Sequence, residues 1–154
     1  MNQDHTFHMN RAYQEALKAY DEGEVPVGAV IVREGRIVGR GYNRVENLKD
    51  ATAHAEIIAM SAASSSLASW RLHECSIYVT LEPCLMCVGA MLQARIQTII
   101  YGAADNRMGA IETFRYRDIA QQSYNRFPET VGGVMADQCK MLLQSFFRDL
   151  RKKS

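Results

Sequence analysis

The fold is decided by the stretch Thr80-Leu81-Glu82-Pro83-Cys84-Leu85-Met86-Cys87. It continues a short apolar strand expected over 76–80 and opens a helix expected over 84–94, because proline suits the first turn of a helix. The two cysteines are three residues apart and therefore share one helix face. A helix N-terminus stabilises thiolates, the form that binds a metal. The stretch predicts a strand–helix unit with two metal ligands at the start of the helix.

A second stretch, Ala53-His54-Ala55-Glu56, opens another helix, expected over 53–67. One imidazole and two thiolates suit zinc, so we expect His54, Cys84 and Cys87 to bind a single zinc ion. Three protein ligands leave one coordination position for water, which is typical of catalytic zinc. Glu56 is then the candidate for proton transfer. Residues two apart point about 200° from each other on an ideal helix, so spacing alone does not bring both His54 and Glu56 to the metal.

Two other interpretations of the cysteine pair stay open. A C-x-x-C pair can be redox-active, although here it follows the third expected strand and not the first. A structural zinc site requires a fourth ligand from Cys75 or Cys139, and each of these lies in an apolar pattern typical of a buried thiol. Glu82 is assigned a structural role, because the helix dipole favours an acidic residue just before a helix N-terminus.

The rest of the chain predicts a layered α/β fold. The other elements are expected at 9–23 (helix), 27–32 and 36–41 (a hairpin), 98–102 (strand) and 135–150 (amphipathic helix). Residues 103–133 have no clear periodicity apart from a turn at Gly132-Gly133. This order predicts a three-layer α/β/α arrangement around a mixed sheet.

Length and composition narrow the class of protein. With 154 residues, 47% hydrophobic and 23% charged, the chain is expected to form a single domain over 1–154. We find neither a long apolar run nor an apolar N-terminal segment, which predicts no membrane span, no signal peptide and a cytoplasmic location. A formal net charge of +1 does not indicate a globally basic nucleic-acid binder, but it permits a local basic patch.

These motifs resemble the zinc-dependent cytidine and nucleoside deaminases, whose signature is H-x-E followed by P-C-x-x-C. The resemblance runs along nearly the whole chain and is closest to the bacterial tRNA adenosine deaminases. The other matching segments are 24–29, 41–44, 101–105 and 136–147, whereas 109–114 and 124–126 depart from the family pattern. The resemblance implies a cytidine-deaminase-like fold with a mixed five-stranded sheet.

The resemblance also implies a function and a set of site residues. It implies a hydrolase that removes an amino group from a nucleobase, with one zinc ion per subunit, Glu56 as the proton-transfer residue, and a homodimeric state. The substrate-binding residues that it implies are Val27, Asn43, Ala55, Leu81, Ala103 and Asp105. Asn43 and Asp105 each have an alternative interpretation as ordinary turn or loop residues.

Two segments carry a local excess of positive charge. Residues 107–126 hold four arginines against two acidic residues, and 148–154 hold four basic residues against one acidic residue. Aromatic residues interleave with the arginines, as on surfaces that stack single-stranded nucleic acid. The candidate RNA contacts are Arg115, Arg117, Arg126, Phe147, Arg148, Arg151, Lys152 and Lys153. The alternative is a solvated loop and tail.

The leading prediction is therefore deamination of adenosine to inosine at the wobble position of a tRNA anticodon loop. The departures within 109–126 keep a second prediction open, a deaminase of a free base or small nucleoside such as guanine or cytosine. A third prediction is a non-catalytic RNA-binding module stabilised by zinc. The presence of Glu56 argues against it.

Overall fold

The chain folds around a mixed five-stranded sheet, and the computed structural model describes residues 2–120 and 126–153. The helices are α1 (Asn2–Asp21), α2 (Val45–Leu48), α3 (Ala55–Leu67), α4 (Leu85–Ala94), α5 (Tyr116–Ile119) and α6 (Ala136–Lys153). The strands are β1 (Gly28–Arg33), β2 (Arg36–Tyr42), β3 (Cys75–Leu81), β4 (Thr98–Ala103) and β5 (Glu129–Val131).

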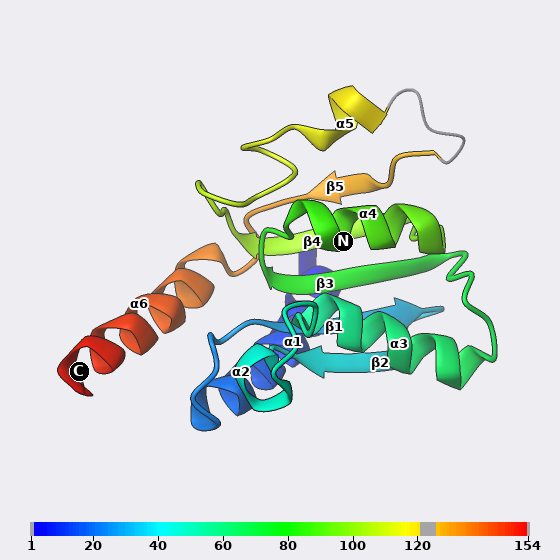
Figure 1. Ribbon diagram of the computed structural model, residues 1–154. Coiled ribbons are helices and arrows are strands. Elements are labelled where there is room, and N and C mark those ends of the chain that lie inside the picture. Colours follow the sequence, from blue (N-terminus) through cyan, green and yellow to red (C-terminus); the bar gives the residue numbers. More distant parts are fainter. Residues whose placement is uncertain (1, 121–125, 154) are drawn as a thin grey trace.

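The strand order is β2-β1-β3-β4-β5, as Figure 1 shows. Strand β1 pairs antiparallel with β2 and β3, whereas β3–β4 and β4–β5 are parallel. The expected hairpin is confirmed, with its turn at Glu34-Gly35, where both residues have positive φ. The prediction of a mixed sheet is confirmed as well.

Helices cover both faces of the sheet. Alternate strand residues such as Ile31 and Ile77 pack with α3 and α4, while Val30 and Ile100 pack on the other face with Met9 of α1. Helix α6 contacts β4 and then projects beyond the sheet (Figure 1). The predicted α/β/α layering is therefore confirmed.

Helix α3 lies unusually close to β2 because glycine faces alanine at the contact. A Cβ at Gly41 would lie 2.5 Å from the Ala55 carbonyl oxygen, and one at Gly39 would lie 2.4 Å from the Ala59 carbonyl oxygen. No side chain larger than hydrogen fits between these backbones. This contact fixes the N-terminus of α3 at one end of the sheet.

Several boundaries differ from the sequence expectation. Helix α1 begins at Asn2 and not near residue 9, because its first turns are polar and give no apolar period. The four-residue helices α2 and α5 were not expected, since one turn is too short to show a period. Residues 121–125, within the predicted basic segment 107–126, lie outside the described residues. Within the described ranges, none of the helices has the length and apolar character needed to cross a membrane.

Candidate active site

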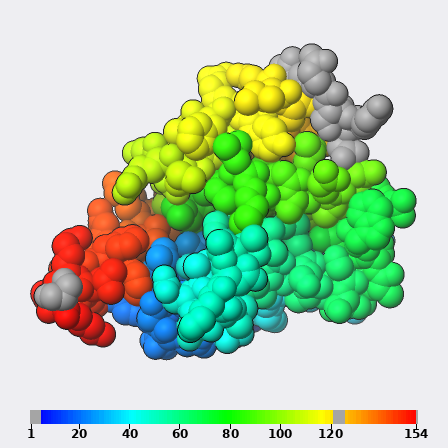
Figure 2. Space-filling model, viewed as in Figure 1, coloured from blue at the N-terminus to red at the C-terminus, as the bar shows by residue number. Residues whose placement is uncertain are grey.

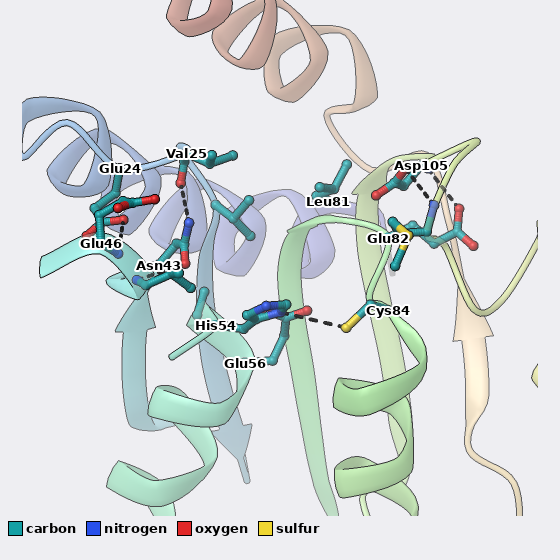
Figure 3. Close-up of a pocket in the computed structure, with 14 residues that line it drawn as sticks. Glu24, Val25, Asn43, Glu46, His54, Glu56, Leu81, Glu82, Cys84 and Asp105 are labelled. Atoms are coloured by element: carbon teal, nitrogen blue, oxygen red, sulfur yellow. Dashed lines mark hydrogen bonds between the residues drawn. The ribbon is translucent and has the colours of Figure 1, made fainter. Parts of the chain in front are cut away.

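The predicted metal ligands meet where β3 ends and where α3 and α4 begin. His54 is the N-cap of α3 and Cys84 is the N-cap of α4, and both have extended backbones with ψ of 151° and 174°. Neither side chain makes a capping hydrogen bond. The extended residue changes the direction of the chain just before the helix, so His54 and Glu56 both face the site although they are two residues apart (Figure 3).

The three candidate ligands have the spacing that zinc requires. The His54 Nδ1 atom lies 3.7 Å from Cys84 Sγ and 3.5 Å from Cys87 Sγ, and all three ligand atoms lie within 4.8 Å of one another. Zinc–sulfur and zinc–nitrogen bonds of normal length around a tetrahedral centre place sulfur and nitrogen about 3.5 Å apart. The residues therefore fit a zinc ion with Nδ1 of His54 as the nitrogen ligand. Cys75 and Cys139 are buried elsewhere and are not members of this group.

The two thiols differ in their acidity. The hydrogen bond with Cys87 is the main cause that lowers the pKa of Cys84, to about 4, and His54 contributes to the same shift. The pKa of Cys87 is raised, because its thiol donates that hydrogen bond and is largely buried. These shifts favour Cys84 as the thiolate of the pair, beside an imidazole whose pKa is raised by its hydrogen bond to Cys84.

Glu56 lies next to this group and is almost fully buried, with 4% of its surface exposed. Burial raises the pKa of Glu56 to about 7, and the charge of His54 opposes that shift. A general acid–base group is most effective when its pKa is near the working pH. The geometry therefore offers a proton-transfer group that is not itself among the three clustered ligands.

A cavity of about 340 Å³ opens above these residues. It is lined by five of the six residues that sequence reasoning assigned to the substrate, namely Val27, Asn43, Ala55, Leu81 and Asp105. Ala103, at the end of β4, is not among the residues that line it. Besides His54, Glu56 and Cys84, the other lining residues are Glu24, Val25, Val45, Glu46, Glu82 and Met108, none of which was predicted to bind substrate. Glu24, Val25 and Glu82 belong to segments that were singled out in the sequence, whereas no pattern in the sequence pointed to Met108.

Comparison with known proteins assigns the chain to a family. The cytidine and deoxycytidylate deaminase zinc-binding region matches residues 1–103, which include all three candidate ligands. The chain belongs to this deaminase family. The tRNA-specific adenosine deaminase of Bacillus subtilis is 40% identical over 153 residues, 99% of this chain and 94% of that protein. The chloroplastic tRNA(adenine(34)) deaminase of Arabidopsis thaliana is 56% identical over 102 residues, 66% of this chain and 8% of that protein.

Solved structures of other deaminases agree with the fold. A tRNA:A34 deaminase structure, studied for A-to-I editing at the wobble position, superposes with a TM-score of 0.84 at 39% identity. The match covers 89% of this chain and 99% of that one. The guanine deaminase of Nitrosomonas europaea has a TM-score of 0.78 at 20% identity, covering 92% of this chain and 83% of that one, and thus shares the fold.

Asn43 and Asp105 of this deaminase combine a local role with a place in the cavity. The Asn43 side chain accepts a 3.4 Å hydrogen bond from the Val45 N–H and donates to the Val25 carbonyl. Asp105 accepts from the N–H groups of Arg107 and Met108. The turn interpretation of both residues is therefore observed, and both also line the cavity.

Glu82 has a structural role, but not the one expected from the helix dipole. Its carboxylate is buried and accepts hydrogen bonds from the N–H groups of Asp105, Ile111 and Glu112, not from the first turn of α4. The contact partners are more than twenty residues away in the sequence. No local pattern could have indicated them.

The candidate RNA residues lie in two places. Phe147 and Arg151 line a groove on α6, and Arg148, Lys152 and Lys153 follow on the same helix. Arg126 lies near the start of β5, at the edge where the parallel strands β3, β4 and β5 begin, whereas the cavity lies where β3 and β4 end. Arg115 pairs with Asp118, and Arg117 stacks on Phe127. The structure thus brings the α6 residues together and leaves the arginines of 115–126 apart from them.

Proposed function

We propose that this deaminase converts adenosine to inosine at the wobble position of a tRNA. The observation that carries the choice of substrate is the 40% identity with the Bacillus subtilis tRNA-specific adenosine deaminase, which extends over 99% of the chain. The guanine deaminase shares only 20% of its residues with this chain, although its fold is similar. The proposed site is the cavity that contains Glu56 and the three clustered ligands.

In the proposed mechanism His54, Cys84 and Cys87 hold one zinc ion, and Glu56 moves the protons. Zinc bound in such a site supplies a water molecule that ionises near neutral pH. Glu56 would take one proton from the attacking water and deliver it to N1 of the adenine ring. It would then take the remaining proton from the new hydroxyl on C6 and deliver it to the C6 amino group, which leaves as ammonia while C6 becomes the carbonyl carbon of inosine. The Ala55 N–H lies in the first turn of α3, where the helix itself offers it no carbonyl partner, and in this mechanism it donates to the substrate.

A groove beside the cavity supports an RNA substrate. It measures about 520 Å³ and is lined by Arg107, Lys140, Leu143, Gln144, Phe147, Leu150 and Arg151. Three of these residues are cationic and none is acidic, and Phe147 offers a partly exposed aromatic ring. Arg107 belongs to the segment between Asp105 and Met108, which line the cavity. Figure 2 shows α6 at the edge of the molecule, beside this segment. A base in the cavity can therefore have its neighbouring phosphates near the groove.

The deciding experiment measures ammonia and inosine from a panel of substrates. The panel holds an anticodon stem-loop with adenosine at the wobble position, the same stem-loop with guanosine there, and free adenosine, guanine and cytosine. We expect turnover of the first alone. Ammonia from a free base, with no inosine from the stem-loop, would refute the substrate and leave the zinc chemistry in place.

The variant Glu56→Gln tests the role of the proton-transfer group. It keeps the size of the side chain and leaves the three ligands intact, so zinc should stay at one ion per chain. Removal of a general acid–base group costs about 10²–10⁴-fold in rate. If the Glu56→Gln variant keeps a tenth of the wild-type rate, Glu56 does not have this role. If the wild-type protein itself turns over no substrate of the panel, a non-catalytic RNA-binding module is favoured.

We also propose a homodimer and a cytoplasmic location. Leu85 and Met86, on the first turn of α4 beside Cys84, are 43% and 38% exposed and offer apolar area for a second copy. Light scattering should then give twice the chain mass. The cytoplasmic location follows from the proposed tRNA substrate.

A further inference from the structure

Two buried carboxylates lie on opposite sides of the cavity and have no part in the mechanism above. Glu24 is 1% exposed and Glu82 is 2% exposed. Figure 3 places them on either side of His54 and Glu56, with Glu82 on the side of Cys84. A buried charged group is stable only when hydrogen bonds replace its water. The groups that donate hydrogen bonds to each carboxylate therefore show which part of the chain that carboxylate holds in place.

Glu82 binds the segment 105–112. Its Oε1 atom accepts from the Asp105 N–H at 2.9 Å, and its Oε2 atom accepts from the N–H groups of Ile111 and Glu112 at 2.9 and 2.7 Å. The segment passes so close that a Cβ at Gly109 would lie 2.2–2.4 Å from the carboxyl atoms of Glu82. Its residues Asp105 and Met108 line the cavity. The Glu82 carboxylate therefore fixes one side of the opening.

Glu24 binds helix α2 in the same manner. Its Oε1 atom accepts from the Glu46 N–H at 3.1 Å, and its Oε2 atom accepts from the Asn47 backbone N–H at 2.7 Å and from Asn47 Nδ2 at 2.6 Å. Helix α2 is one turn long and has no buried residue, so packing holds it weakly. Val45 and Glu46 line the cavity. The Glu24 carboxylate therefore fixes the opposite side.

We infer that Glu24 and Glu82 are positioning residues that hold α2 and the 105–112 segment in place around an RNA nucleotide. This inference rests on the proposed function. The start of α3, with His54 and Glu56, is held against β2 by the close contact of Gly41 with Ala55, and α4 packs in the core beside the sheet. The 105–112 segment also contacts the start of α4, where the Ala110 N–H donates to the Pro83 carbonyl at 2.9 Å and Gly109 pairs with Cys84. Loss of the Glu82 carboxylate leaves these backbone contacts in place, so it displaces the substrate contacts of the segment more than the reacting groups. The effect of losing either carboxylate therefore falls mainly on KM and less on kcat.

The test uses the full chain with zinc bound and the variants Glu82→Gln and Glu24→Gln. A glutamine has one acceptor oxygen, so its NH2 group faces N–H donors that the second carboxylate oxygen had bound. Each variant should raise KM for the stem-loop at least tenfold and change kcat less than threefold, at unchanged zinc content. Glu15→Gln is the matched control, because Glu15 is also buried but pairs with Lys18 on α1, and its KM should equal that of the wild type.

Amide hydrogen exchange reports the positions of the two segments without any substrate. Glu82→Gln should speed exchange at 105–112 alone, and Glu24→Gln should speed it at 45–48 alone. Gly109→Ala crowds Glu82 while keeping its charge and should reproduce the KM increase of Glu82→Gln. If Glu82→Gln does not fold or loses zinc, the KM values and exchange rates of Gly109→Ala and Glu24→Gln test the inference instead.

The outcomes separate this inference from the function on which it rests. A wild-type enzyme that does not deaminate the stem-loop refutes the proposed function and the inference together. If the wild-type enzyme is active, the inference alone is refuted by either of two results. Either the variants melt at lower temperature but keep the wild-type KM, or amide exchange speeds up equally in both segments. A raised KM with segment-specific exchange supports it.

Discussion

The close contact between β2 and α3 predicts that a single added methyl group will disturb the active site. A Cβ at Gly41 would lie 2.5 Å from the Ala55 carbonyl oxygen, whereas ordinary contact begins at 3.4 Å, so the start of α3 must move by about 0.9 Å. His54 and Glu56 flank Ala55 and move with it. Overpacking of this kind costs about 1–3 kcal/mol, and a misplacement near 1 Å costs about 10²-fold in rate. Gly41→Ala should therefore lower the Tm and reduce kcat together.

Two matched variants separate the local from the general effect. Gly39→Ala meets the same helix one turn further on, at Ala59, and should lower the Tm as much but reduce kcat less. Gly89→Ala adds a methyl group on α4 with no neighbour nearer than 3.9 Å, and alanine favours a helix by about 1 kcal/mol, so its Tm should not fall. Thermal melts and initial rates on the stem-loop measure these effects. The reasoning fails if Gly41→Ala behaves like Gly89→Ala.

Three other perturbations give sharp expectations. His54→Asn places a strong N-cap residue on α3, so after zinc is removed by chelation the variant should be about 1 kcal/mol more stable than the wild type. With zinc bound, the wild type should be the more stable of the two. Equal melting temperatures after chelation would contradict this. After chelation Cys84 should react first with iodoacetamide, because hydrogen bonds lower its pKa to about 4, while burial raises the pKa of Cys139 to about 12 and keeps it inert; faster labelling of Cys139 would contradict this. Neutralising Arg151, Lys152 and Lys153 by glutamine should reduce the slope of log affinity for the stem-loop against log salt by up to about 2, at about 0.7 per contact, and an unchanged slope would remove them from the RNA surface.

Local sequence signals predicted the layers and the reacting residues because those signals act within one or two turns. The period of apolar residues indicated the helices, and the hairpin followed from Glu34-Gly35 between apolar runs. The three candidate ligands were found because side-chain chemistry and spacing restrict the metal. The contacts of Glu82 with 105–112 could not be predicted in this way, since they join residues 23 to 30 positions apart through backbone N–H groups that any residue type provides. Ala103 illustrates the converse, because its place at a strand end indicated the right region although the residue does not line the cavity.

The N-termini of α3 and α4 explain why two short motifs are enough to form this site. His54 and Cys84 both occupy N-cap positions, where an uncharged hydrogen-bonding side chain would usually satisfy a free N–H group of the first turn. Here neither side chain caps its helix, so both are available for a metal at the positive ends of the two helices. Two helix dipoles then place partial positive charge where a thiolate, a water losing its proton and a developing oxyanion all carry negative charge. The stability given up at the two caps is regained only when a metal binds, which makes zinc binding and folding of this end of the sheet one coupled process.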